Sequence, residues 1–148
     1  MSVQNKVMEQ MKTAMKSKDT VALESLRALK SAFLLANTSG GKVELTEEDE
    51  IKIVQKLVKQ RKDSAAIFKE QDRMDLASPE EAQAKILEQF LPAQMSEEEL
   101  KDVIEGIITQ TGASSMKDMG RVMGMASKQL AGKADGKAIS TIVKQLLS

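Results

Sequence analysis

The stretch Asp118-Met-Gly-Arg-Val-Met-Gly-Met-Ala-Ser-Lys-Gln-Leu130 has the pattern of an amphipathic helix, yet it carries two glycines in the helix body. Its apolar residues recur at i, i+4, i+7 and i+11 and share one face: Met119, Met123, Ala126 and Leu130. Gly120 and Gly124 lie one turn apart beside that face, and each costs about 1 kcal/mol relative to alanine in a helix interior. The pattern predicts a helix from about residue 115 to 131, with another group approaching its backbone closely.

Helical periodicity continues on both sides of this stretch and predicts an all-α fold. A further helix is expected to begin near Asp135, where it buries Ile139, Ile142, Val143 and Leu146. Before the stretch, Ser96-Glu-Glu-Glu99 is the pattern of a full capping box, and Gly112 can end the helix that it opens. We therefore expect a C-terminal three-helix subdomain over residues 93–148, preceded by a hinge at Leu91-Pro-Ala-Gln94.

Residues 1–92 are expected to form an N-terminal helical subdomain of about four helices. The signals are a helix around Val7–Met15, a second capped by Asp19 or Thr20 that fades at Asn37-Thr-Ser-Gly-Gly41, and a third from Thr46 to about Gln71. Ser78-Pro-Glu-Glu81 predicts the start of the fourth, because proline is favoured at the first helical position, and Arg73-Met-Asp-Leu76 is then a polar loop. On the third helix, Lys56, Lys59 and Asp63 share a face, which predicts ion pairing within that helix.

The composition excludes most catalytic equipment. The 148 residues include no His, Cys, Trp or Tyr, so thiol or imidazole catalysis and Cys/His metal sites are impossible within this chain. The acidic clusters Glu47-Glu-Asp49 and Glu97-Glu-Glu99 stand at expected helix starts, where acids serve as caps rather than metal ligands. We expect no catalytic residue, no cofactor and no metal. No apolar run approaches the ~20 residues of a membrane span, so we expect a cytoplasmic protein without membrane contact.

The zero net charge hides a basic C-terminal segment. From Gly112 onward the only acids are Asp118 and Asp135, against six lysines and arginines. Glycines allow close approach, cations supply charge, and a helix N-terminus supplies N–H donors, a combination that fits a nucleic-acid backbone. The candidate RNA-binding residues are Lys117, Gly120, Arg121, Gly124, Lys128, Gly132, Lys133, Gly136 and Lys137.

A purely structural interpretation stands beside this one, and the residues by themselves favour it. Gly120 and Gly124 could let their helix pack against a neighbouring helix, Gly132 and Asp135 could be ordinary caps, and the lysines could form a solvated face. The methionines of this segment suit core filling better than an adaptable binding surface. The only aromatic residues, Phe33, Phe68 and Phe90, all fall on apolar faces, so base stacking is not expected.

Over essentially its whole length the chain resembles the YqeY family, which is similar to the tail domain of GatB, the B subunit of the tRNA-dependent amidotransferase. The resemblance rests on the order and spacing of several motifs: Leu26-Arg-Ala-Leu-Lys-Ser31, Lys59-Gln-Arg-Lys-Asp-Ser64, Arg73-Met-Asp-Leu76, Ile86-Leu-Glu-Gln-Phe-Leu-Pro92, Met119-Gly-Arg-Val-Met-Gly124 and Gly132-Lys-Ala-Asp-Gly136. One departure is Gln71-Asp72, where the family tends to have glycine.

The resemblance implies two helical subdomains and a link to tRNA, because the related amidotransferase tail helps to hold tRNA while a separate part performs catalysis. It also implies partners such as an amidotransferase or an aminoacyl-tRNA synthetase. We therefore expect a non-catalytic, tRNA-binding accessory protein. The alternatives are a helical protein-interaction module for such an enzyme and, more weakly, a carbon–nitrogen ligase with glutamine as amide donor acting within a larger complex.

Overall fold

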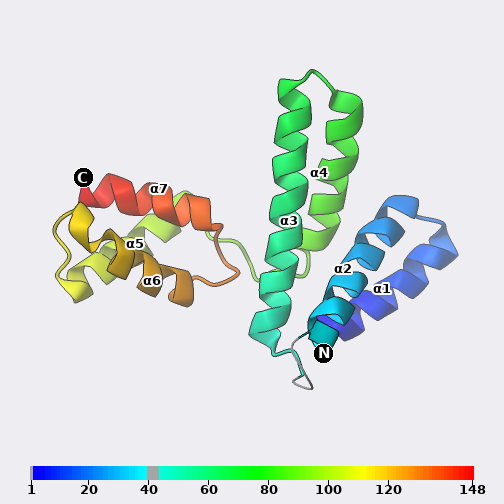
Figure 1. Ribbon diagram of the computed structural model, residues 1–148, viewed down its shortest axis with the longest axis horizontal. Coiled ribbons are helices and arrows are strands. Elements are labelled where there is room, and N and C mark those ends of the chain that lie inside the picture. Colours follow the sequence, from blue (N-terminus) through cyan, green and yellow to red (C-terminus); the bar gives the residue numbers. More distant parts are fainter. Residues whose placement is uncertain (1, 40–43) are drawn as a thin grey trace. The chain divides into compact units, whose positions relative to one another are not determined.

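The computed structural model describes residues 2–39 and 44–148, and these are all-α, as expected, with no strand among them (Figure 1). In chain order the helices are α1 (Val3–Ser17), α2 (Thr20–Ser39), α3 (Glu47–Glu70), α4 (Met74–Glu88), α5 (Glu97–Thr111), a 3₁₀ turn η1 (Met116–Asp118), α6 (Met119–Gln129) and α7 (Gly136–Leu147). Gly40 and Gly41, part of the loop expected after the second helix, lie outside the described residues.

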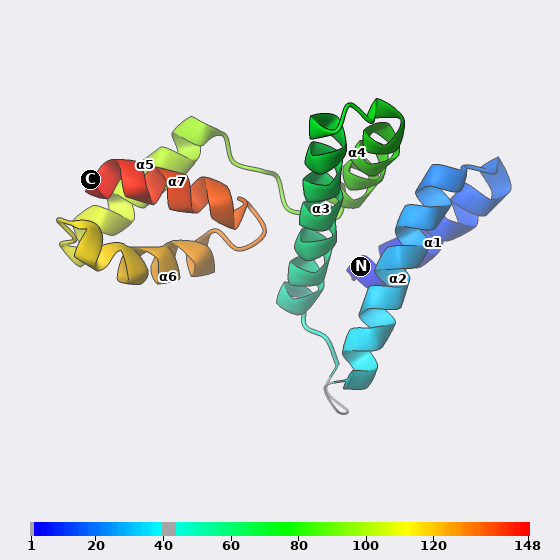
Figure 2. The ribbon, with the colours of Figure 1, turned by 45° about the horizontal axis from the view of Figure 1, so that its top comes forward.

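The chain divides into two compact units, Met1–Leu91 and Pro92–Ser148. In the first unit, α1 and α2 form one helical hairpin and α3 and α4 another (Figures 1 and 2). Each unit has its own core. The first buries Val3, Val7, Ala14, Leu26, Leu29, Phe33, Val54, Val58, Leu87 and Phe90, and the second buries Leu100, Ile104, Ile107, Val122, Ala126, Leu130, Ala134, Ile139, Ile142, Val143 and Leu147.

Side-chain caps set several helix starts where the sequence indicated them. Thr46 and Asp49 form a reciprocal capping box at the start of α3, and the bonds from the Thr46 backbone N–H and hydroxyl lower the pKa of Asp49 below its ordinary value. At α5 the Ser96 hydroxyl accepts the Glu99 N–H at 3.2 Å, but no return bond from the Glu99 side chain is present among the described residues. The expected full box at α5 is therefore wrong, and only its first half forms.

The start of α4 differs from the expectation. This helix begins at Met74, so Pro79 lies inside it rather than at its first position, and Ser78 is not its cap. The chain reverses at Asp72, whose φ of +57° is in the left-handed region that favours glycine, and the Arg73 N–H then donates to the Phe68 carbonyl at 2.8 Å. Ala77, in the first turns of α4, is completely buried.

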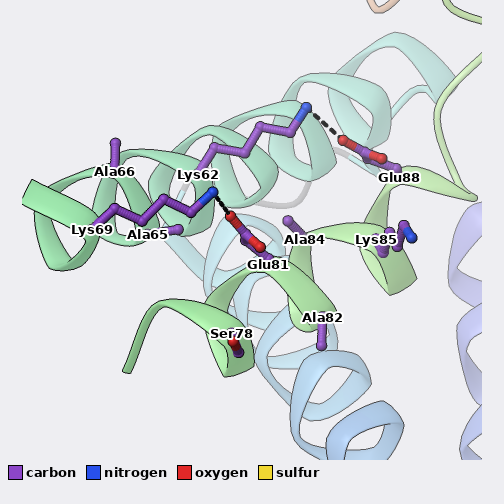
Figure 3. Close-up of a pocket in the computed structure, with 10 residues that line it drawn as sticks. All are labelled: Lys62, Ala65, Ala66, Lys69, Ser78, Glu81, Ala82, Ala84, Lys85 and Glu88. Atoms are coloured by element: carbon purple, nitrogen blue, oxygen red, sulfur yellow. Dashed lines mark ion pairs between the residues drawn. The ribbon is translucent and has the colours of Figure 1, made fainter. Parts of the chain in front are cut away.

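Ion pairs fasten α3 to α4 across a groove of about 660 Å³ (Figure 3). Lys62 pairs with Glu88 and Lys69 with Glu81, and both pairs cross from one helix to the other. Four alanines line the groove between them: Ala65, Ala66, Ala82 and Ala84. The expected pairing within α3 is wrong, since Lys56, Lys59 and Asp63 make no ion pair with any described residue. Small side chains bring α4 so close that cations of α3 reach its carboxylates.

Candidate nucleic-acid interface

The two glycines of α6 lie on its exposed face. The helix buries Val122 and Ala126 and packs against α5 and α7. Gly120 and Gly124 are both exposed, and a Cβ atom added at either one would meet nothing within 4 Å. Packing against a neighbouring helix within the described chain is therefore not the reason for these glycines. They leave a strip of bare helix backbone open to solvent, which we call the glycine strip.

Three cations flank the glycine strip, and one of them, Arg121, already forms an ion pair within the chain. Lys117 lies in η1 and Lys128 near the end of α6, and both are exposed and make no ion pair with any described residue. The Arg121 guanidinium instead pairs with the Asp118 carboxylate at 3.2 Å, and that carboxylate also accepts the Ser114 N–H. Arg121 therefore carries charge at the surface but shares it with Asp118.

Hydrogen bonds from the segment before α5 hold the turn after α6. Gly132 is buried and has a φ of +77°. Glycine adopts this left-handed conformation at little cost because it has no Cβ atom. Its carbonyl accepts a hydrogen bond from the Gln94 side chain at 2.8 Å, and the Met95 N–H donates to the Lys133 carbonyl at 3.0 Å. The segment before α5 is thus fastened to this turn. Gly132 has a structural role that the sequence also allowed, and it offers no exposed surface.

The N-terminus of α7 is capped within the chain. The Asp135 carboxylate accepts the Lys137 N–H at 2.8 Å, so one of the donors expected to be free is already occupied. Lys133 and Lys137 nevertheless line an open cleft of about 480 Å³, together with the carboxylates of Glu97 and Asp135. Gly136, the first residue of α7, is exposed with open space around it. Lys133 and Lys137 therefore add to the positive charge at this end, where one helix N–H group is already occupied.

The candidate residues thus fall into two neighbouring groups in the second unit. One comprises Lys117, Gly120, Arg121, Gly124 and Lys128 on one outer side of η1 and α6, and the other comprises Lys133, Gly136 and Lys137 at the start of α7. Within the described residues, no group of three or more acidic side chains could hold a metal ion, and no helix is long and apolar enough to cross a membrane. The arrangement offers positive charge and exposed helix backbone.

Aromatic stacking has no place in this surface. Phe33 and Phe90 are buried in the core of the first unit and Phe68 is half-buried on α3, while the chain has no Trp or Tyr. Other apolar side chains are exposed instead: Met116 and Met125 beside the glycine strip, and Leu34 and Leu35 on α2. The exposure of the two leucines was missed from the sequence, although the helical spacing of Leu26, Leu29 and Phe33 marks the inward side and leaves both leucines off it.

The fold and surface define a small, helical, two-unit protein whose second unit carries a basic, glycine-bearing helix, α6. Comparison with known sequences makes the assignment specific: the chain matches the family described as Yqey-like protein over residues 4–147, and it belongs to that family. The family resemblance expected from the motifs is therefore confirmed.

Individual relatives connect the family to two kinds of protein. Over 107 residues the chain is 31% identical to the E-type subunit of glutamyl-tRNA(Gln) amidotransferase from Thermococcus gammatolerans, covering 70% of this chain and 17% of that relative. It is 32% identical over 107 residues to the mitochondrial protein altered inheritance of mitochondria protein 41 of Clavispora lusitaniae, covering 70% and 61%. An uncharacterized protein of Schizosaccharomyces pombe is 35% identical over 83 residues, covering 56% and 67%. The relation to a tRNA-dependent amidotransferase is confirmed, although the relative matched is the E-type rather than the B-type component.

Proposed function

We propose that this chain binds structured RNA, with tRNA as the first candidate, through the outer side of α6 and the basic start of α7. The observation that carries the proposal is the glycine strip, which is exposed and has no packing partner within the described chain. Gly124 lies in the interior of α6 and costs about 1 kcal/mol relative to alanine, while Gly120 lies in the first turn and costs less, so a strip without an internal partner favours an external one. The unpaired cations of Lys117 and Lys128 beside it favour a polyanion.

In this proposal the cations contact phosphates and the glycines admit the RNA backbone. Lys117 and Lys128 are eleven residues apart, about 16 Å along a helix, so they reach separate phosphates. Lys133, Lys137 and Gly136 extend the contact to the start of α7, and Arg121 adds charge from its pair with Asp118. Because exposed aromatic side chains are absent from the described chain, recognition rests on shape and charge rather than on base stacking.

The relation to an amidotransferase component supports the choice of tRNA. The chain matches a small part of that relative, whose name refers to glutamyl-tRNA. We propose that the chain acts as a non-catalytic accessory to such an amidotransferase or to an aminoacyl-tRNA synthetase. Among the described residues, no Ser, Thr or Lys side chain forms a recognisable nucleophile–base pair, so the amide-donor ligase alternative needs catalytic residues from another protein.

The test is a titration of the purified chain with total tRNA at two salt concentrations. Affinity should fall by about 0.7–0.9 log units per log unit of salt for each phosphate neutralised. Lys133→Glu with Lys137→Glu should reduce affinity at least about tenfold, since two phosphate contacts are reversed in sign. The matched control is Lys12→Glu with Lys16→Glu, which changes the same charge on two exposed, unpaired lysines of α1.

Two results would contradict the proposal. One is no tRNA binding at low salt, and the other is equal loss of affinity in the α1 control and the α7 variant. The exposure of Met116 and Met125, 45% and 37%, favours a second candidate in which the same helix receives a protein partner. A complex with an amidotransferase or synthetase that survives high salt but is lost with Met125→Lys would establish that alternative.

A further inference from the structure

An exposed basic and apolar face lies on α2, within the first unit. Leu34 and Leu35 are 63% and 68% exposed, more than any other large apolar side chain among the described residues. Arg27 and Lys30 precede Leu34 by seven and four residues, so the three lie on one side of the helix. Neither cation makes an ion pair with a described residue. We call these four residues the leucine face.

A second exposed patch lies where α3 turns into α4. Its apolar side chains are Ile67, Met74 and Leu76, which are 53%, 53% and 38% exposed. Two exposed carboxylates, Glu70 and Asp72, lie between them in the chain and make no ion pair with a described residue. Arg73 and Asp75 neutralise each other in a two-bond pair that raises the pKa of Arg73 and lowers that of Asp75. Lys69, the other cation of this segment, pairs with Glu81 of α4. We call this acidic and apolar patch, residues 67–76, the hairpin tip.

The two patches lie at opposite ends of the first unit. Leu34 and Leu35 are near the end of α2, and α3 starts from that same end of the unit (Figures 1 and 2). From there α3 extends through 24 residues, about 36 Å, before the chain reaches the hairpin tip. The leucine face therefore cannot cover the hairpin tip of its own copy.

We propose that the first unit associates with a second copy of itself, with the leucine face of each copy against the hairpin tip of the other. The contact is complementary in charge and in apolar character, since unpaired cations meet unpaired carboxylates and exposed leucines meet exposed apolar side chains. A two-fold axis makes this contact twice, which buries all five large apolar side chains on each copy and closes the assembly at a dimer.

The first measurement is sedimentation of the full chain between about 1 and 300 µM, a range that captures interfaces of modest affinity. The 16.2 kDa chain should approach twice its mass as concentration rises. Leu35→Glu should raise the dimer dissociation constant at least about tenfold, because a charge replaces a central apolar contact. Met15→Glu is the matched control: that side chain is 54% exposed on α1 and lies outside both patches, so the dimer should persist.

A charge exchange tests the pairing itself. Arg27→Glu with Lys30→Glu makes the leucine face acidic, and Glu70→Lys with Asp72→Lys makes the hairpin tip basic. Each variant alone should stay monomeric, because like charges then meet in both contacts. An equimolar mixture should restore the dimer as a mixed pair, since an acidic face meets a basic tip and a basic face meets an acidic tip.

Circular dichroism should show native helix content in all variants, because every substituted side chain is exposed. A parent chain that remains monomeric at about 300 µM would overturn the proposal. So would a dimer that is unaffected by Leu35→Glu, or a mixture of the two charge variants that stays monomeric. Binding of the leucine face to anionic vesicles or to another protein, without self-association, would also reject a second copy as its occupant.

Discussion

At the scale of single residues, polar side chains cap the starts of α1, α3, α5 and α7. Glu50 shows how such a residue can act across the fold: its carboxylate is buried on α3 and accepts the Gln4 N–H at 3.0 Å, near the start of α1. A helix N-terminus stabilises an anion, and the anion in turn satisfies a free N–H group. The same residue in the sequence is one of four acids in the first turn of α3, with nothing to distinguish it from the other three.

We therefore expect Glu50→Ala to lower the free energy of unfolding by about 1–3 kcal/mol, because a partly buried N–H group loses its acceptor. Glu48→Ala is the control from the same helical turn, since Glu48 is exposed and pairs with Lys52 only at the surface. That change should stay below about 0.5 kcal/mol. Urea unfolding monitored by circular dichroism measures both, and equal effects would show that the Gln4 bond contributes nothing.

At the scale of the element, α6 combines a well-packed inner face with an outer face that is costly for a helix. Val122 and Ala126 are fully buried, whereas Gly120 and Gly124 have no neighbour that their missing side chains would displace. Gly106 in α5 is equally open. The charges around these positions differ: cations flank the two glycines of α6, whereas α5 carries five of the second unit's seven acids. The contrast gives a direct way to separate stability from binding.

Gly124→Ala should raise the free energy of unfolding by about 1 kcal/mol, because alanine is the better helix former and its Cβ enters open space. The same substitution should weaken tRNA binding if RNA approaches the helix backbone there. Gly106→Ala should give a similar gain in stability with unchanged tRNA affinity. Thermal unfolding and tRNA titration of the two variants provide the measurements. Unchanged affinity in Gly124→Ala would exclude the glycine strip from the interface.

At the scale of the whole molecule, each unit has its own core, and no buried residue belongs to both clusters. Leu29 is completely buried in the first unit and Ile104 in the second. A core leucine or isoleucine contributes about 2–5 kcal/mol to the unit that buries it. If the two units unfold independently, a substitution in one core should destabilise only the unit that contains it. Unfolding experiments can therefore test the expected boundary between residues 92 and 93.

We expect Ile104→Ala to reduce hydrogen-exchange protection by about 2–5 kcal/mol in α5–α7 while leaving α1–α4 unchanged, because only the second core loses a side chain. Leu29→Ala is the reciprocal variant and should affect α1–α4 alone. Hydrogen exchange read by mass spectrometry assigns the loss to peptides of each unit. A uniform loss across both units in either variant would mean that the chain unfolds as one cooperative body.

Local signals in the sequence determined most of the helices and much of the family assignment. The capping box of Thr46 and Asp49, the stop at Gly112 and the cap at Asp135 depend on residues close together in the chain, so each was predictable. The motifs around Gly120 and Gly124 likewise indicated the family, which the match over residues 4–147 confirms. The ligand of the glycine strip and its flanking cations stays a prediction.

Only the tertiary structure decided features that depend on distant residues. Pro79 indicated a helix start, yet α4 begins at Met74, and Ala77 in its first turns is completely buried. Periodicity left two explanations for Gly120 and Gly124, and the open space around them excludes packing within the described chain. The exposure of Leu34 and Leu35 likewise became apparent only in the structure, because it depends on which side chains the other helices cover. A sequence pattern shows which residues share a face, whereas what covers that face depends on the packing of other helices.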